Sequence, residues 1–175
     1  MPRFHRGIGR REWIAGCAGI SSARMADEYG DNVWAELPEV WDGIYGKRLV
    51  REEGRPLAGA VWELPPGSRG VDYHFHHGTE EYLVVLRGRA TLRTPEGERE
   101  LPEGTVVHFS PGPEGAHTVM NLGEEPVRYL IIAAHASPDI IEYPDKGTFV
   151  AGAKSLSQRG KPFFVRLPMP EPGET

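Results

Sequence analysis

Turn-forming residues punctuate the chain at short intervals from residue 57 onward, and this spacing limits the possible fold more than any other feature. The turns read Pro65-Pro66-Gly67, Pro95-Glu96-Gly97 and Pro102-Glu103-Gly104, combinations that are typical of tight turns. The chain holds 22 glycines and 16 prolines, enough to end a segment every few residues. Short apolar or alternating segments lie between the turns, which predicts an all-β sandwich or barrel. The expected strands are 57–64, 72–77, 81–86, 89–94, 98–101, 105–109, 117–121, 127–134 and 163–167.

The length of 175 residues fits one domain with one hydrophobic core. No internal repeat is visible, so we expect a single barrel. We place an irregular N-terminal arm at 1–43, the barrel at 44–167 and a loose C-terminal tail at 168–175. The only segment in which a longer helix is expected follows Pro138.

Charge and cysteine content narrow the expected partners and compartment. The formal net charge is -5, which argues against a nucleic-acid partner because nucleic-acid-binding surfaces are normally basic. No apolar run approaches the roughly 20 residues of a membrane-spanning helix. The single cysteine, Cys17, excludes an intramolecular disulfide and suits a reducing compartment. We therefore expect a cytoplasmic protein without nucleic-acid or membrane partners.

Two short stretches of the arm offer an alternative to this location. Arg10-Arg11 loosely resembles a twin-arginine export signal, and Ile14-Ala15-Gly16-Cys17 resembles a lipoprotein cleavage box. Both signals need an apolar stretch of about 7–15 residues, whereas 13–20 is short and broken by glycine. A mobile or lightly docked arm is therefore the preferred interpretation.

The histidine-rich segment 73–81 carries the strongest indication of chemistry. Successive side chains of a strand point to opposite faces, so His74 and His76 project the same way, about 7 Å apart along the backbone. Phe75 and His77 face the other way. Two imidazoles at this spacing can converge on one metal ion.

A carboxylate and a third imidazole complete the candidate site. Glu81 enters the next strand directly after the turn, and Leu83 and Val85 share its face and give the site an apolar surround. The best candidate for a fourth ligand is His117, which follows the glycine-rich loop 110–116 and begins a strand.

This donor set selects a class of metal. Three imidazoles and one carboxylate suit one divalent transition metal, namely iron, manganese, nickel, zinc or cobalt, and do not suit calcium. Four protein ligands leave positions open for water, oxygen or substrate on an ion that prefers six. Each histidine taken alone is more simply an ordinary hydrogen-bonded or solvated side chain, but the His-x-His pair together with Glu81 favours the metal site.

These residues resemble the two motifs of the cupin superfamily. The first motif combines a glycine, a His-x-His pair, a glutamate and a second glycine, which stand here as Gly70, His74, His76, Glu81 and Gly88. The gap after Gly70 is two residues shorter than in the family, and Gly67 is the alternative first glycine. The second motif stands as Gly104, Pro111, Gly115, His117 and Asn121, with a longer loop before the histidine. The resemblance covers 57–134.

The resemblance implies an antiparallel double-stranded β-helix, or jelly roll, with one metal ion per chain in the barrel mouth. It implies His74, His76, Glu81 and His117 as the metal ligands. It also implies a homodimer, in which the arm 1–43 could cross to the partner subunit.

The resemblance leaves two classes of function open. The first is a metal-dependent enzyme of the dioxygenase or the isomerase and lyase type, acting on a small polar molecule. The second is a non-catalytic module that binds or senses a small molecule. The sequence identifies no general base; the only candidates are His108 and Tyr73, whose facing the sequence does not fix.

Overall fold

The computed structural model describes residues 31–41, 43–49, 56–153 and 163–169. The chain divides into two compact units, 1–35 and 36–175, and all strands described below belong to the second unit. Most of the predicted N-terminal arm, residues 1–30, lies outside the described residues.

Thirteen strands among the described residues form three antiparallel sheets. The six-stranded sheet has the order β1 (Glu39–Trp41), β2 (Ile44–Leu49), β3 (Leu57–Leu64), β10 (Val127–Ala134), β5 (Glu80–Arg87), β8 (Val106–Phe109). The four-stranded sheet has the order β13 (Phe163–Pro168), β12 (Thr148–Ala153), β11 (Asp139–Tyr143), β4 (Phe75–His76). The three-stranded sheet has the order β7 (Gly97–Pro102), β6 (Arg89–Thr94), β9 (Thr118–Met120).

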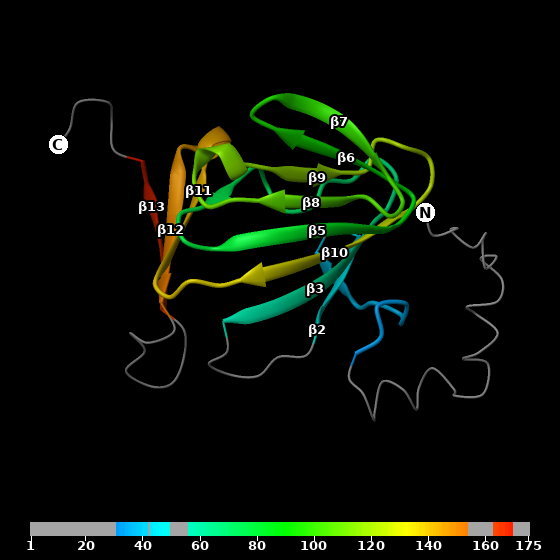
Figure 1. The fold of residues 1–175 in the computed structure, drawn as a ribbon, viewed down its shortest axis with the longest axis horizontal. Helices are drawn as coiled ribbons and strands as arrows, with labels where there is room; N and C mark the ends of the chain where they lie inside the picture. Colours follow the sequence, from blue (N-terminus) through cyan, green and yellow to red (C-terminus); the bar gives the residue numbers. More distant parts are fainter. Residues whose placement is uncertain (1–30, 42, 50–55, 154–162, 170–175) are drawn as a thin grey trace, which may run out of the picture. The chain divides into compact units, whose positions relative to one another are not determined.

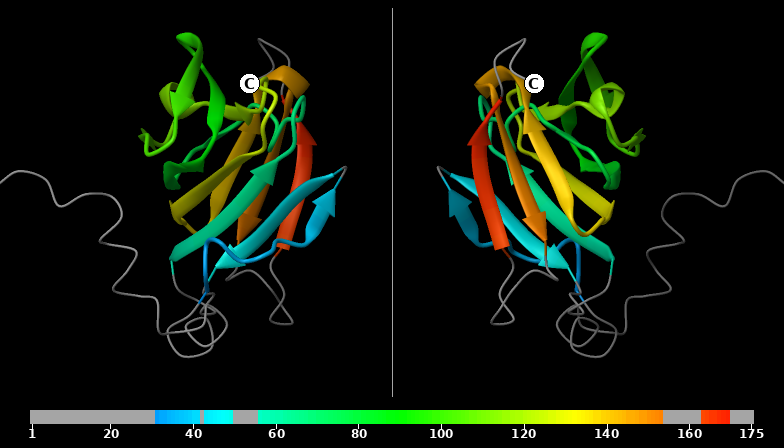
Figure 2. Two further views of the ribbon diagram at one scale, coloured as in Figure 1. Left: turned by 90° about the vertical axis from the view of Figure 1, so that its right-hand side faces the viewer. Right: turned by 90° about the vertical axis from the view of Figure 1, so that its left-hand side faces the viewer.

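The order of the strands along the chain defines a jelly roll. From β3 to β11 the chain passes repeatedly from the six-stranded sheet to one of the smaller sheets and back. Figure 1 shows β3, β10, β5 and β8 side by side, with β11, β12 and β13 gathered at one end. Figure 2 shows the β6–β7 hairpin projecting from the rest of the barrel. The predicted all-β, double-stranded β-helix fold is confirmed.

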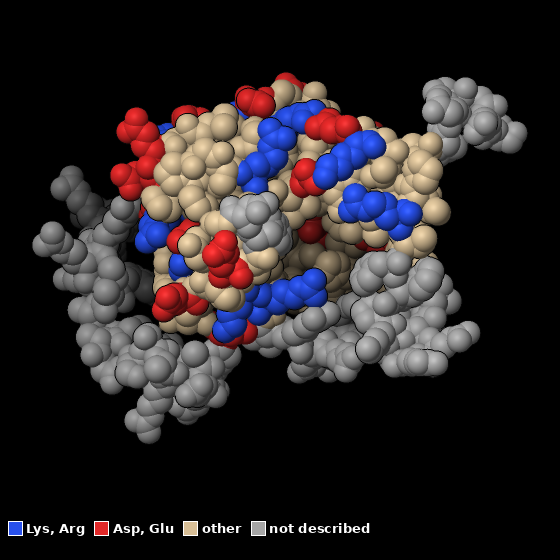
Figure 3. Space-filling model, turned by 180° about the vertical axis from the view of Figure 1, so that it is seen from behind, with Lys and Arg blue, Asp and Glu red and all other residues tan. Residues whose placement is uncertain are grey.

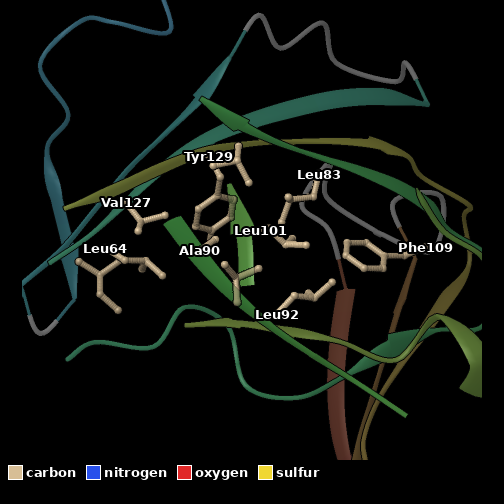
Figure 4. Packing of buried hydrophobic residues seen from close by; sticks show 11 residues of the cluster. Leu64, Leu83, Ala90, Leu92, Leu101, Phe109, Val127 and Tyr129 are labelled. Atoms are coloured by element: carbon tan, nitrogen blue, oxygen red, sulfur yellow. The ribbon is translucent and has the colours of Figure 1, made fainter. Parts of the chain in front are cut away.

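Alternation along β5 places one set of its side chains inside the barrel. Glu81, Leu83 and Val85 are buried, whereas Glu80 and Tyr82 are exposed, as a strand period of two requires. The apolar members of the inward set join a core that includes Leu64, Leu92, Val127 and Tyr129, drawn in Figure 4.

The core and the candidate site occupy different parts of the barrel interior. Strand β10 lies between β3 and β5, and a register shift at Arg128 brings Tyr129 opposite both Trp62 and Val85. Four residues further along β10, Ala133 lies opposite Glu81. This end of β10 carries the small residues Ala133 and Ala134. Because their side chains are short, space remains in front of the Glu81 carboxylate.

The prediction of a helix after Pro138 is wrong. This segment forms β11, which pairs with β4 and β12, then the short 3₁₀ helix η2 (Pro144–Lys146), and then β12. Its residues Ile140, Ile141 and Tyr143 favour strands, and the two neighbouring strands satisfy its backbone groups on both sides. The described residues contain no helix long and apolar enough to span a membrane.

Two boundaries also differ from the expected ones. The predicted arm 1–43 includes β1, which pairs with β2 at the edge of the six-stranded sheet. The predicted strand 72–77 is regular only at β4, because its start instead makes an isolated bridge between His74 and His117. Residues 170–175 of the predicted tail lie outside the described part of the chain.

Candidate metal centre

The four predicted ligands come from three neighbouring places in the barrel and are all buried. His76 lies on β4 and Glu81 on β5. His74 and His117 form a backbone bridge, in which each amide donates to the other's carbonyl at 3.1 and 2.8 Å. This bridge brings the two predicted motifs together although 43 residues separate their histidines in the sequence.

The side chains of these residues converge. One ligand atom from each of His74, His76 and Glu81 lies within 4.8 Å of the others. His117 is outside this tightest group, but its Nε2 atom is 3.5 Å from Glu81 Oε2, and His76 Nε2 is 3.8 Å from the same oxygen. The ring centroids of His74 and His117 are 4.7 Å apart.

Hydrogen bonds fix the orientation of all three imidazoles. His74 Nδ1 lies 2.7 Å from the Asp72 carbonyl oxygen, and His117 Nδ1 lies 2.9 Å from that of Gly115. A carbonyl oxygen only accepts, so Nδ1 carries the proton in both rings and Nε2 keeps its lone pair. That tautomer is the one that binds a metal through Nε2.

Burial also keeps two of the rings neutral. Desolvation lowers the pKa of His74 to about 4 and that of His117 to about 3, because a buried imidazolium loses its hydration. For His76, burial acts in the same direction, but the Asp139 hydrogen bond and the Glu81 charge together raise its pKa. Burial raises the pKa of Glu81. A bound cation would favour the ionised carboxylate and the neutral imidazoles.

Asp139 is a site residue that the sequence did not suggest. Its Oδ2 atom lies 2.6 Å from His76 Nδ1 and accepts a hydrogen bond from Thr79 Oγ1 at 2.8 Å. Its Oδ1 atom accepts from the amides of Gly78 and Ile140. Four hydrogen-bond partners thus hold the carboxylate, and its Oδ2 atom faces Nδ1 of the His76 ring. Such a carboxylate–histidine pair orients a metal ligand and raises its basicity.

The loop before His117 also helps to position this candidate ligand. The 3₁₀ helix η1 (Pro113–Gly115) directly precedes it, and the Gly112 amide donates to the His76 carbonyl oxygen at 2.8 Å. The Phe109 ring stacks on the His117 ring with centroids 3.6 Å apart and planes 5° apart. The longer loop therefore leaves the predicted ligand in place.

A cavity of about 450 Å³ opens in front of the four ligands, within the range of small-molecule sites. Its walls are mostly apolar and include residues of the six-stranded and the four-stranded sheet. The polar side chains that line it beside the ligands are those of Arg48, Trp62, Thr118, Tyr129, His135, Ser137, Asp139 and Tyr143. Figure 3 shows a hollow on the face turned away in Figure 1, with acidic atoms in its depth.

The structure does not place either predicted general base in this cavity. His108 is on the outer face of β8, half-exposed, where it stacks on Tyr82 and lies 3.5 Å from Glu80. The Tyr73 ring packs under Arg93, whose Cζ is 4.1 Å from the ring centroid. Neither residue lines the cavity. His77 faces away as predicted, and its Nε2 atom lies 3.1 Å from Glu142.

The donor set fits a divalent transition metal. Two atoms that each lie about 2.1 Å from one ion are about 3.0 to 3.4 Å apart, close to the 3.5 and 3.8 Å found between the histidine nitrogens and Glu81. In the neutral imidazoles, the Nδ1 hydrogen bonds leave the Nε2 atoms of His76 and His117, which face the Glu81 carboxylate, unprotonated. His74, His76, Glu81 and His117 are therefore the residues that would hold the ion.

The fold and these residues define a jelly-roll barrel with a buried histidine–carboxylate cluster. The family model of the cupin domain matches residues 60–133, which contain all four candidate ligands. Residues 60–133 are therefore similar to the cupin domain, as the sequence motifs predicted. No curated protein sequence matches this chain.

Solved structures similar to this chain include two bacterial cupins. A candidate sugar phosphate isomerase of Acidithiobacillus ferrooxidans is 26% identical, with a TM-score of 0.54 over 63% of this chain and 67% of that protein. A sugar phosphate isomerase of the cupin superfamily from Silicibacter pomeroyi is 21% identical, with a TM-score of 0.57 over 68% of this chain and 76% of that protein. The second likeness concerns the fold alone.

Proposed function

We propose that this protein is a metal-dependent enzyme that isomerises a small polar molecule. The observation that carries the proposal is the position of the four ligands, whose metal-binding atoms converge at the wall of a cavity of about 450 Å³. A purely structural metal is closed off by its protein ligands, whereas a catalytic metal keeps coordination positions open to substrate, here on the side of the cavity.

The metal would supply Lewis-acid polarisation of a substrate carbonyl or hydroxyl oxygen. An aldose–ketose type of isomerisation needs no oxidant or reductant. One C–H bond next to the carbonyl breaks, the proton is delivered to the former carbonyl carbon, and the hydroxyl proton moves to the carbonyl oxygen. The protein must therefore provide groups that donate and accept protons beside the substrate.

Two tyrosines in the cavity wall suit the proton-donating role. Tyr143 stacks on the His74 ring with centroids 5.8 Å apart, and its pKa is raised, mainly by burial. Tyr129 is buried and its pKa is also raised, by burial and by the Glu81 charge. Both hydroxyls are therefore protonated at neutral pH and can hydrogen-bond to a substrate oxygen. His135 also lines the cavity and is the histidine placed to exchange a proton.

The similarity to the Acidithiobacillus ferrooxidans protein supports this choice of reaction. That protein is named for sugar phosphate isomerisation and is 26% identical over 63% of this chain. Unlike dioxygenation, isomerisation also needs no second substrate in the cavity.

Proton NMR in D₂O tests the proposal. The metal-loaded protein is incubated with small aldoses, ketoses and their phosphates, and exchange of the carbon-bound proton next to the carbonyl is followed. We expect exchange and product signals with one of these compounds, and their loss in Glu81→Gln. Tyr143→Phe should keep the metal and lower the rate by about 10²-fold or more. Oxygen consumption with the same compounds, without proton exchange, would instead indicate a dioxygenase and contradict the isomerase.

A further inference from the structure

The cavity wall opposite the histidines carries a single basic side chain among the described residues that line it, that of Arg48 on β2. The other charged side chains in the lining are the carboxylates of Glu81 and Asp139. Asp139 is already engaged with His76 and Thr79, and Glu81 faces the histidine nitrogens. Among the described residues that line the cavity, Arg48 is thus the one Lys or Arg side chain that a bound molecule can reach.

The direction of Arg48 follows from the register of β2. Arg48 is paired with Ala60 on β3, and Ala60 is paired with Ile131 on β10. All three residues line the cavity. Lys47, the preceding residue, is paired with Val61 and does not line it. Alternation therefore puts two neighbouring cations on opposite faces of the same strand.

Among the described residues, the Arg48 side chain makes no interaction that would stabilise the fold. Within the described part of the chain, neither a hydrogen bond nor an ion pair involves its guanidinium, and its neighbours in the wall are mostly apolar, such as Leu49 and Ala58. Several other arginines are paired: Arg128 and Arg87 both bond Glu63, and Arg93 bonds Asp145. An unpaired arginine over a cavity is a ready partner for an anionic group.

A second basic side chain near the cavity, that of Arg166, also favours an anionic ligand. The Arg166 guanidinium lies 5.2 Å from the centroid of the Tyr143 ring, which lines the cavity. Figure 3 shows several Lys and Arg side chains around the hollow, together with Asp and Glu side chains.

We propose that Arg48 anchors an anionic group of the substrate, a phosphate or a carboxylate, while the polar end of the same molecule reaches the histidine–glutamate cluster. This assignment rests on the proposed function, because it names the substrate class of that site. The apolar walls between the two ends would bury the carbon chain of the substrate. Arg48 is a binding residue and takes no part in proton transfer.

Paired probes that differ only in charge test this role. Binding to the metal-loaded protein is measured by calorimetry for glycerol 3-phosphate against glycerol, and for succinate against succinamide. We expect the wild type to prefer the anionic member of at least one pair, and Arg48→Gln to lose about 10- to 100-fold of that affinity. The pair that responds identifies phosphate or carboxylate as the group.

Three controls make the result specific. Lys47→Gln removes the neighbouring cation from the other face and should bind as the wild type does. Arg48→Lys keeps the charge but loses the planar fork, so it should retain part of the affinity. Binding of glycerol and succinamide should not change in any variant. Equal losses in Lys47→Gln and Arg48→Gln would overturn the proposal, as would unchanged anion binding in Arg48→Gln or no preference for either anion.

The result can be separated from the outcome for the proposed function. If Arg48→Gln turns over its substrate with an unchanged KM, the anchor is refuted while the isomerase stands. If the wild type binds anions through Arg48 but catalyses no proton exchange, the anchor stands and the isomerase is refuted.

Discussion

At the scale of single residues, the candidate site depends on a carboxylate that does not itself face the metal position. Asp139 holds His76 through one oxygen and is held by Thr79, Gly78 and the Ile140 amide. In its neutral form the His76 ring therefore carries its proton on Nδ1, and Nε2 is unprotonated and directed at Glu81.

We predict that Asp139→Asn weakens metal binding by about 10- to 100-fold, because the amide is neutral and no longer raises the basicity of His76. Metal affinity is measured by competition with a chelator of known affinity. Glu142→Gln is the matched control, since Glu142 lies on the same strand and bonds His77, which faces away from the site. Unchanged affinity in Asp139→Asn, or an equal loss in Glu142→Gln, would show that Asp139 has no positioning role.

The four candidate ligands could be predicted from the sequence, but their supporting residues could not, and the reason is physical. A strand period of two and a turn of fixed length place His74, His76 and Glu81 together from local information alone. Asp139 reaches His76 only through the pairing of β11 with β4, 63 residues away in the chain. Arg48 reaches the cavity in the same way, through β3. Nothing local in either segment marks it as part of a site.

At the scale of elements, the loop before His117 depends on the close packing of Gly115. A Cβ atom at this position would overlap the Ser110 backbone, including its carbonyl oxygen. Gly115 also provides the carbonyl oxygen that orients His117 Nδ1. Gly115 therefore both permits the close turn and orients the candidate ligand His117.

We predict that Gly115→Ala lowers the free energy of unfolding by more than about 2 kcal/mol and weakens metal binding, because the loop must shift to admit the methyl group. Chemical denaturation and chelator competition give the two quantities. Gly123→Ala is the control, since its Cβ would be 3.5 Å from the nearest atom, Asn121 Oδ1. Equal behaviour of the two variants would contradict the role assigned to the loop.

The elements themselves were predicted to different degrees. The boundaries of β3, β6 and β10 agree with the sequence prediction, because clear turn signals end these segments. The segment after Pro138 has an apolar pattern that fits a helix as well as a buried strand. Pairing with β4 and β12 decides its conformation, and such long-range pairing is not visible in the sequence.

At the scale of the whole molecule, the apolar core and the candidate metal centre are distinct but adjacent, since Phe109 of the core stacks on His117. Leu64, Leu83 and Leu92 have no exposed surface and pack in the core cluster, to which none of the candidate ligands belongs. The barrel should therefore remain folded without metal.

We predict that a chelator leaves the far-ultraviolet circular dichroism spectrum unchanged but lowers the Tm. At a free metal concentration of 100 times Kd, binding stabilises the folded state by about 2.7 kcal/mol, or about 5 to 10 °C for a chain of this size. Scanning calorimetry with and without added metal measures the shift. Unfolding of the metal-free protein at room temperature would contradict a core that folds without the metal. A Tm that does not respond to metal would contradict metal binding by the folded protein.

The homodimer implied by the sequence motifs stays a prediction. Val106 and Tyr82 on the outer faces of β8 and β5 are 59% and 47% exposed, and exposed apolar side chains on a sheet favour association. Light scattering should give twice the 19.4 kDa mass of one chain. A mass of one chain across the accessible concentration range would refute the dimer.

The central claim is that His74, His76, Glu81 and His117 hold one divalent transition metal. Elemental mass spectrometry tests it most directly, on protein purified without a chelator or a metal-affinity tag, beside His76→Ala and the control His77→Ala. We predict close to one iron, manganese, nickel, zinc or cobalt ion per chain in the wild type and in His77→Ala, and its loss in His76→Ala. A folded wild-type protein that contains none of these metals and cannot be loaded with any of them would contradict the account.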